Sequence, residues 1–159
     1  MSRPVLIASL VLLILVVVAG VAVSRFSLTA LDEPGQSESY LATKAKRMLV
    51  SRDSRGVSQG PAATPASVAA GEKLYGAECG TCHGLNARTP TDNGRWMYPR
   101  AADLTSEQVQ QYSDRELFWI VRNGIRLSGM PAFGRVETDE HIWQLVHYVR
   151  SLSPSAKQR

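Results

Sequence analysis

The sequence predicts an all-α protein in which one membrane-spanning helix precedes a small helical domain. An apolar run without any charged residue covers residues 4–23. Further along the chain, helix-starting signals stand at Thr64, Ser113 and Thr138, and the segments that follow them are helical in pattern. Outside the apolar run, the chain has room for one domain of about 95 residues, which excludes a large multidomain enzyme.

The apolar run is long enough to cross a bilayer, because twenty helical residues at ~1.5 Å each span ~30 Å. A cleaved signal peptide is the alternative, but its apolar region is usually about 7 to 15 residues long. The small residues around Ala22, at the end of the run, also form only weak cleavage sites. We therefore expect residues 1–25 to form a retained single-pass anchor. Arg3 precedes the run and only Arg25 follows it closely, which favours a cytoplasmic N terminus. We expect the membrane to be a bacterial inner membrane, so that the remaining chain lies on the periplasmic side.

Residues 26–63 are polar, rich in Ser, Gly and Pro, and predicted to form a tether. If it were fully flexible, a tether of ~40 residues would reach ~35 Å. Within it, residues 38–55 combine basic side chains with an apolar stripe at helical spacing, which predicts a short basic amphipathic helix. Two interpretations stay open: a solvated spacer, or a helix that docks on a membrane partner or on lipid headgroups. The stripe consists of Leu41, Ala45, Met48 and Leu49.

The charge distribution argues against a nucleic-acid-binding protein. The chain carries a net charge of +4, but residues 64–159 hold eleven Lys or Arg against ten Asp or Glu, whereas residues 1–63 hold seven against four. The basic excess therefore lies near the N terminus. The C-terminal part has no basic stripe interleaved with aromatic residues, as a single-strand binder would.

The two cysteines of the chain lie three positions apart, and a histidine follows the second at once: Cys79, Cys82 and His83. Cys-x-x-Cys-His is the attachment signature of a c-type haem. Residues i and i+3 share one face of a helix, so two thiols at this spacing can form thioethers with one porphyrin. The histidine then lies next to the iron.

Three other functions of the same cysteines are less compatible with the sequence. A structural zinc site needs four ligands, and the next candidates, His141 and His147, are too far along the chain for finger spacing; we expect both at the surface. A redox dithiol would follow a strand, but the preceding segment is helical in pattern. A disulfide between residues three apart would close almost no loop and stabilise little.

The sixth position of the iron decides between a carrier and a catalyst, and Met130 is the candidate for it. Pro131 restricts Met130 to extended geometry, and Gly129 lets the backbone pass close to a flat cofactor. Met97 is the other methionine of the domain, but it stands between two aromatic neighbours, which favours apolar packing.

These residues together resemble the class I c-type cytochromes over about residues 65–152. The resemblance rests on the Cys-x-x-Cys-His-Gly motif, on the Gly-Met-Pro loop that follows it, and on helices at both ends. It implies a small helical fold around one haem c, bound covalently through Cys79 and Cys82, with His83 and Met130 as axial ligands. Residues 64–159 would then form the haem domain.

The resemblance also implies contacts around this centre. A glycine and an aromatic residue of the first helix, here Gly71 and Tyr75, would cross the last helix near Leu145 and Tyr148. The carbonyl of Ala102 would accept a hydrogen bond from His83. Trp96, Tyr98 and Arg100 would donate to the haem propionates, and Leu104 would contact the haem.

The expected function is electron transport without enzymatic activity: the protein would carry single electrons between membrane-bound redox complexes of a respiratory or photosynthetic chain. The donor would be a quinol-oxidising complex, and the acceptor a terminal oxidase or a reaction centre. Two alternatives stay open. The chain could be a fixed cytochrome c subunit of a larger membrane oxidoreductase, or a haem peroxidase or gas sensor in which Met130 leaves the iron.

Overall fold

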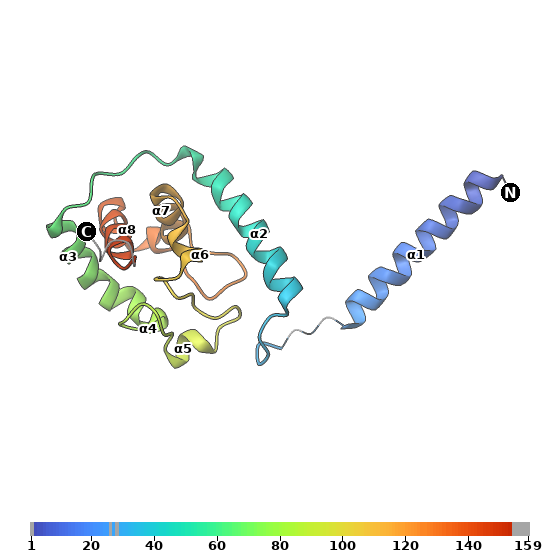
Figure 1. Ribbon diagram of the computed structural model, residues 1–159, viewed down its shortest axis with the longest axis horizontal. Helices are drawn as coiled ribbons and strands as arrows, with labels where there is room; N and C mark the ends of the chain where they lie inside the picture. The colour runs from blue at the N-terminus through green and yellow to red at the C-terminus, as the bar shows by residue number, and fades with distance from the viewer. Residues whose placement is uncertain (1, 26, 28, 154–159) are drawn as a thin grey trace.

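The computed structural model describes residues 2–25, 27 and 29–153 of the chain. All regular elements of these residues are helices, which confirms the all-α prediction (Figure 1). In chain order they are α1 Arg3–Arg25, α2 Gln36–Asp53, η1 Ser54–Gly56, α3 Pro65–Leu74, η2 Tyr75–Cys79, α4 Gly80–His83, α5 Asp92–Arg95, α6 Glu107–Gln110, α7 Asp114–Asn123, η3 Phe133–Arg135 and α8 Asp139–Ser151.

The first helix stands apart from the rest of the chain (Figure 1). α1 has 23 residues, its side chains are exposed along its whole length, and by length and composition it could cross a membrane. A signal sequence near an N terminus has the same properties. The structure thus contains one candidate span among the described residues.

Helices α3 and α8 cross at the centre of the domain. The contact is close because Gly71 has no side chain: a Cβ there would lie 2.0 Å from the Gln144 carbonyl oxygen of α8. Next to the crossing, the rings of Tyr75 and Tyr148 are 5.1 Å apart, and both residues are buried together with Leu145. The helix contact implied by the resemblance is therefore present.

We expect Gly71→Ala to destabilise the protein by about 1–3 kcal/mol, because the new methyl group would press on backbone rather than on a side chain that can move. For a domain of this size, the loss corresponds to a fall in Tm on the order of 10 °C. Thermal unfolding followed by circular dichroism measures it. Gly76→Ala is the matched control, since a Cβ at Gly76 would have no neighbouring atom within 4 Å. Equal Tm values for both variants would contradict the close crossing.

The three predicted helix starts are confirmed as N-caps. Thr64 Oγ1 accepts a hydrogen bond from the Ser67 amide at 3.1 Å, and Ser67 Oγ accepts one from the Thr64 amide. Ser113 and Glu116 form the same reciprocal pair at the start of α7. Thr138 accepts from the third amide of α8. Each cap satisfies amides that the helix itself leaves unpaired.

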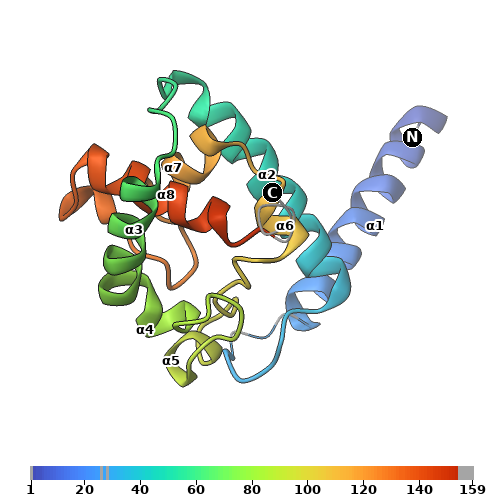
Figure 2. The same cartoon turned by 60° about the vertical axis from the view of Figure 1, so that its left-hand side comes forward.

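Most of the predicted tether is packed on the domain. α2 runs along one side of the domain beside α6 and α7 (Figures 1 and 2). Its residue Val50 is only 2% exposed and belongs to the main core cluster. The apolar residues that surround Val50 belong mainly to α7 and α8, so the cause of this packing lies far along the chain from α2. The other buried members of the cluster are Tyr112, Leu117, Phe118, Ile142, Val146 and Val149.

The segment after α2 is also fixed to the domain, and it buries a histidine. His147 is 6% exposed, so its predicted place at the surface is wrong. Its Nε2 donates to the Pro61 carbonyl oxygen at 3.1 Å, and its Nδ1 lies 2.9 Å from Ser67 Oγ. Gly60 lies so close to the indole ring of Trp143 that a Cβ would be 2.5 Å from it. His141, by contrast, keeps a side chain that is 44% exposed.

We expect Val50→Ala to lower the stability of the haem domain by about 2 kcal/mol, because it removes buried methyl groups and leaves a cavity between α2, α7 and α8. Met48→Ala is the matched control on the same helix, since Met48 is 67% exposed and its loss should change little. Denaturant unfolding of both variants measures the difference. A free tether would make the two variants equally stable.

Candidate functional site

Cys79, Cys82 and His83 lie on one continuous stretch of helix after α3. Cys79 ends the π-helical turn η2, and the other two residues belong to α4. Both thiols are free and half-buried. Burial raises the pKa of the Cys79 thiol to about 12. The π-helical turn η2 runs directly into the short helix α4, and such π-turns often occur at functional sites.

The residue after the motif turns the chain away from the helix. Gly84 has a φ of +74°, and a Cβ there would lie 2.1 Å from the Thr89 carbonyl oxygen. Tyr75 Oη donates a 2.7 Å hydrogen bond to the Gly84 carbonyl oxygen. The Tyr75 side chain thereby connects the α3–α8 crossing to the end of the motif.

The imidazole of His83 is held by one backbone contact. His83 Nδ1 lies 2.8 Å from the Ala102 carbonyl oxygen, as the resemblance implied. A carbonyl oxygen only accepts, so Nδ1 carries the proton and Nε2 has a free lone pair. The carbonyl is positioned by its neighbours: the Leu104 amide donates to the Ala87 carbonyl at 2.8 Å, and the half-buried Leu104 side chain packs against both core clusters. Burial lowers the pKa of His83, and the hydrogen bond to Ala102 opposes this shift.

Met130 lies in the loop between α7 and η3. α7 ends at Asn123, and the next residue, Gly124, has a φ of +68°. A Cβ on Gly124 would meet the Met130 carbonyl oxygen at 2.7 Å. The Met130 amide donates to Ser128 Oγ at 3.2 Å, and its carbonyl accepts from the Ile125 amide at 3.3 Å. The backbone on both sides of the thioether is therefore fixed.

Met97 reaches the same loop, which the sequence did not predict. A Cβ on Gly129 would lie 2.4 Å from Met97 Sδ, so the Met97 side chain rests directly on the backbone beside Met130. This contact connects the loop to the segment that follows the His83 motif. Met97 is half-buried, as expected for apolar packing. No local signal indicated Gly129 as its neighbour.

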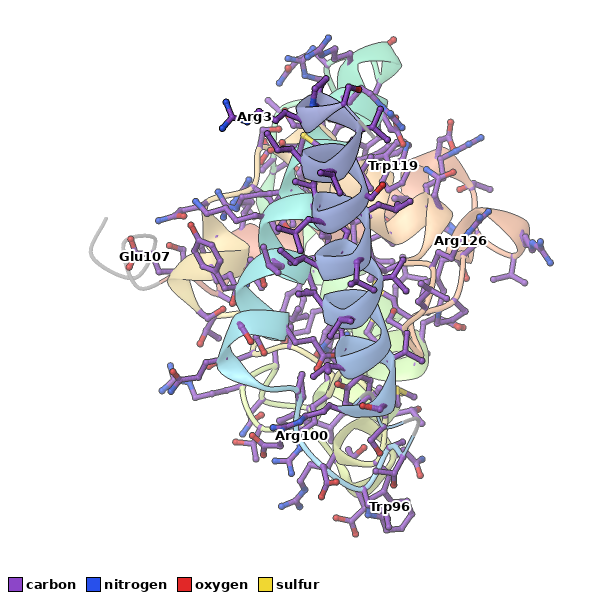
Figure 3. All side chains as sticks on the ribbon, turned by 90° about the vertical axis from the view of Figure 1, so that its right-hand side faces the viewer. Arg3, Trp96, Arg100, Glu107, Trp119 and Arg126 are labelled. Atoms are coloured by element: carbon purple, nitrogen blue, oxygen red, sulfur yellow. The ribbon has the colours of Figure 1, made fainter. Side chains whose placement is uncertain are left out.

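The three predicted propionate donors lie in the segment after α5, with their polar groups on other partners or in solvent. Tyr98 Oη donates to Glu38 Oε1 of α2 at 2.5 Å, and this hydrogen bond raises the pKa of Tyr98. Arg100 Nη1 lies 2.7 Å from Glu33 Oε1. Trp96 is 73% exposed and projects from the lower end of the molecule in Figure 3. Their contact with propionates stays a prediction.

The donor set fits a haem c. Such a group needs two thiols on one helical turn, an imidazole nitrogen with a free lone pair, and a second axial donor on a separate segment. Cys79 and Cys82 supply free thiols, the hydrogen bond to Ala102 selects the required tautomer of His83, and Met130 offers a thioether on a fixed loop.

Comparisons with known proteins give the same class of protein. Cytochrome c-554(547) of Halothiobacillus neapolitanus is 45% identical over 42 residues, which is 26% of this chain and 41% of that protein. A chain of the reducing HAO-like protein complex Kustc0457/Kustc0458 of Kuenenia stuttgartiensis has a TM-score of 0.54 and 26% identity, covering 62% of this chain and 48% of that one. The KustC0563 c-type cytochrome has a TM-score of 0.46 and 31% identity, covering 52% and 96%.

The chain thus spans less than half the length of the first two of these proteins. A family model described as cytochrome C oxidase, cbb3-type, subunit III matches residues 66–149, which contain the cysteine motif, Met130 and the crossing of α3 with α8. Because this match covers more than half of the 159-residue chain, the chain belongs to the cytochrome c family described as cytochrome c oxidase, cbb3-type, subunit III.

Proposed function

We propose that the chain carries single electrons through one haem c, attached at Cys79 and Cys82, with His83 and Met130 as axial ligands. One observation carries the proposal: the 2.8 Å hydrogen bond from His83 Nδ1 to the Ala102 carbonyl leaves Nε2 free for iron, beside two free thiols. A fixed tautomer and orientation is what a histidine ligand requires. Membership of a cytochrome c family supports the same cofactor.

The residues of the site favour a carrier over an enzyme. When bound, haem c supplies an iron that takes up and gives back one electron. The Met130 thioether is a soft ligand, which favours ferrous iron and therefore raises the reduction potential. With His83 and Met130 both bound to the metal, no coordination position is open to a substrate. Electrons then pass without an acid, a base or a nucleophile from the chain.

We also propose that α1 anchors the haem domain to the periplasmic side of a bacterial inner membrane. The length and apolar composition of α1 support an anchor. Arg3, at the first position of α1 and ahead of its apolar run, supports a cytoplasmic N terminus. The electron donor would then be a quinol-oxidising membrane complex, and the acceptor a terminal oxidase or a reaction centre.

A potentiometric titration of the purified full-length protein tests the carrier function. Following the haem absorbance, we expect a single wave with the slope of a one-electron couple. Turnover of hydrogen peroxide with an electron donor, at rates well above those of free haem, would instead favour the peroxidase alternative.

A specific observation favours the second candidate function, a fixed subunit of a larger oxidoreductase. Because α2 and the segment after it are packed on the domain, only residues 26–35 connect the domain to α1. A chain of ten residues, treated in the same way as the predicted tether, would reach ~17 Å, which is about half the reach of that tether. The family description names an oxidase subunit, and the Kuenenia stuttgartiensis neighbour belongs to a complex.

Purification from native membranes in a mild detergent separates the two candidates. A fixed subunit copurifies with the other subunits of its complex, and we expect this result from the short connection. A shuttle leaves the column as a single chain. That outcome would favour a mobile carrier with the same haem chemistry over a fixed subunit.

A further inference from the structure

Helix α2 packs on the domain through one face, and Glu38 in its first turn adds a hydrogen bond from Tyr98. Arg47 Nη2 donates to the Gln108 carbonyl oxygen at 3.0 Å, and the Arg47 guanidinium lies 4.9 Å from the centre of the Tyr112 ring. Gln108 Nε2 reaches Thr43 Oγ1 at 3.5 Å, and Val50 is inserted in the core. Positions 43, 47 and 50 follow helical spacing, so they define a single inward face.

The apolar stripe of α2 lies on the opposite face. Leu41 and Met48 are 65% and 67% exposed, and Leu49 is 42% exposed. Positions 41, 45 and 48 are each about half a turn from the inward positions 43, 47 and 50. An amphipathic helix normally packs its apolar stripe on its own domain. Here the domain uses the other face, so the stripe is left uncovered.

Basic side chains border the exposed face of α2. Lys44 is exposed at its edge, with Nζ lying 5.6 Å from the centre of the Tyr40 ring, and Arg55 is exposed in η1, which follows α2 directly. The two acidic side chains of α2 are already engaged: Glu38 accepts from Tyr98, and Asp53 is paired with Arg52. Apolar residues bordered by Lys and Arg are typical of helices that lie in the headgroup region of anionic membranes.

The position of α2 in the chain keeps it close to the membrane. α1 ends at Arg25 and α2 begins at Gln36, so even a fully extended link would cover only about 35 Å. α2 also forms the side of the domain nearest to α1 in Figures 1 and 2. A span that ends at the headgroups therefore keeps the start of α2 within about 35 Å of the bilayer surface.

We propose that the exposed face of α2 binds the surface of an anionic lipid bilayer, with Leu41, Ala45 and Met48 in the headgroup boundary and Lys44 and Arg55 on lipid phosphates. This inference rests on the proposed role of α1 as an anchor. Because the inward face of α2 is fixed to α6 and α7, lipid binding by α2 holds the whole haem domain in one orientation on the membrane.

The test measures how fast a polyethylene-glycol maleimide modifies a single introduced cysteine in the full-length holoprotein, with one chain in each lipid nanodisc. The native cysteines are unreactive once bound to haem. In discs of phosphatidylcholine with about a quarter of phosphatidylglycerol, we expect Met48→Cys to react about tenfold more slowly than the control Lys73→Cys. Lys73 is an exposed residue of α3, and Figure 1 shows α3 across the domain from α2.

A pair of charge variants tests the lipid contact itself. Adding Lys44→Glu and Arg55→Glu should speed modification of Met48→Cys several-fold in anionic discs, because carboxylates are repelled by lipid phosphates. Arg126→Glu, an exposed substitution outside α2, should leave the rate unchanged. The reduction potential should be the same in all of these variants.

The failures of the two proposals are distinguishable. Release of the chain from native membranes by alkaline carbonate would overturn the anchor. A carbonate-resistant chain whose Met48→Cys reacts as fast as Lys73→Cys in anionic discs would overturn lipid binding by α2 and leave the anchor intact. Protection of Met48→Cys in a copurified complex but not in discs would make the occupant a protein, which also overturns the lipid proposal.

Discussion

Cys79→Ser with Cys82→Ser is expected to abolish stable holoprotein completely. A serine hydroxyl cannot form the thioether that holds haem c, so the cofactor would be lost on purification. The domain is small, and binding of a group to the folded state alone stabilises that state. Without the haem, the chain should unfold more readily and accumulate to a lower level. Haem staining of a denaturing gel and acid-acetone extraction measure covalent attachment.

Thr81→Ser is the control for this experiment, because Thr81 lies between the cysteines, and its backbone carbonyl, which the substitution keeps, accepts a hydrogen bond from Thr91 Oγ1 at 2.5 Å. It should retain haem that resists extraction. Extractable haem in the unmodified protein, or stained haem in the double serine variant, would exclude covalent attachment at this motif.

Met130→His is expected to keep both axial positions filled while lowering the reduction potential on the order of 0.2 V, since axial ligands tune haem potentials over ~0.8 V. The cause is ligand softness: imidazole is a harder donor than a thioether and favours ferric iron. The potential is read from a potentiometric titration of the full-length protein in detergent.

Met97→Leu is the matched control, because Met97 touches the Met130 loop at Gly129 but serves as packing in this account. Leucine keeps the apolar volume, so the potential should stay near the wild-type value. A potential for Met130→His at or above that of the wild type would count against Met130 as ligand. A large fall in the reduction potential of Met97→Leu, without a fall for Met130→His, would instead assign the ligand role to Met97.

Local signals in the sequence were sufficient for much of the fold. The three N-caps depend on side chains within three residues of each helix start, so Thr64, Ser113 and Thr138 could be recognised without tertiary information. The Cys-x-x-Cys-His motif is likewise contiguous. The resemblance to class I c-type cytochromes supplied the more distant contacts, among them Gly71 against α8 and His83 against Ala102.

The packing of α2 could not be predicted in the same way. The sequence predicted an amphipathic helix here, either as a solvated spacer or as a helix that docks on a membrane partner or on lipid headgroups. The structure packs it on its own domain instead, through a face that contains Thr43, Arg47 and Val50. Their partners lie some 60 residues or more further along the chain. His147 was misplaced for a similar reason, because the carbonyl that pairs with it belongs to Pro61 on a segment expected to be solvated.

The central claim is that His83 and Met130 occupy both axial positions of one covalently bound haem. Addition of carbon monoxide to the reduced full-length protein at neutral pH tests it most directly, because carbon monoxide binds ferrous haem only at an open or readily opened position. Met130→Ala is the positive control and should bind the gas. We expect the absorption spectrum of the unmodified protein to stay unchanged; a stoichiometric spectral shift on adding carbon monoxide would contradict the claim.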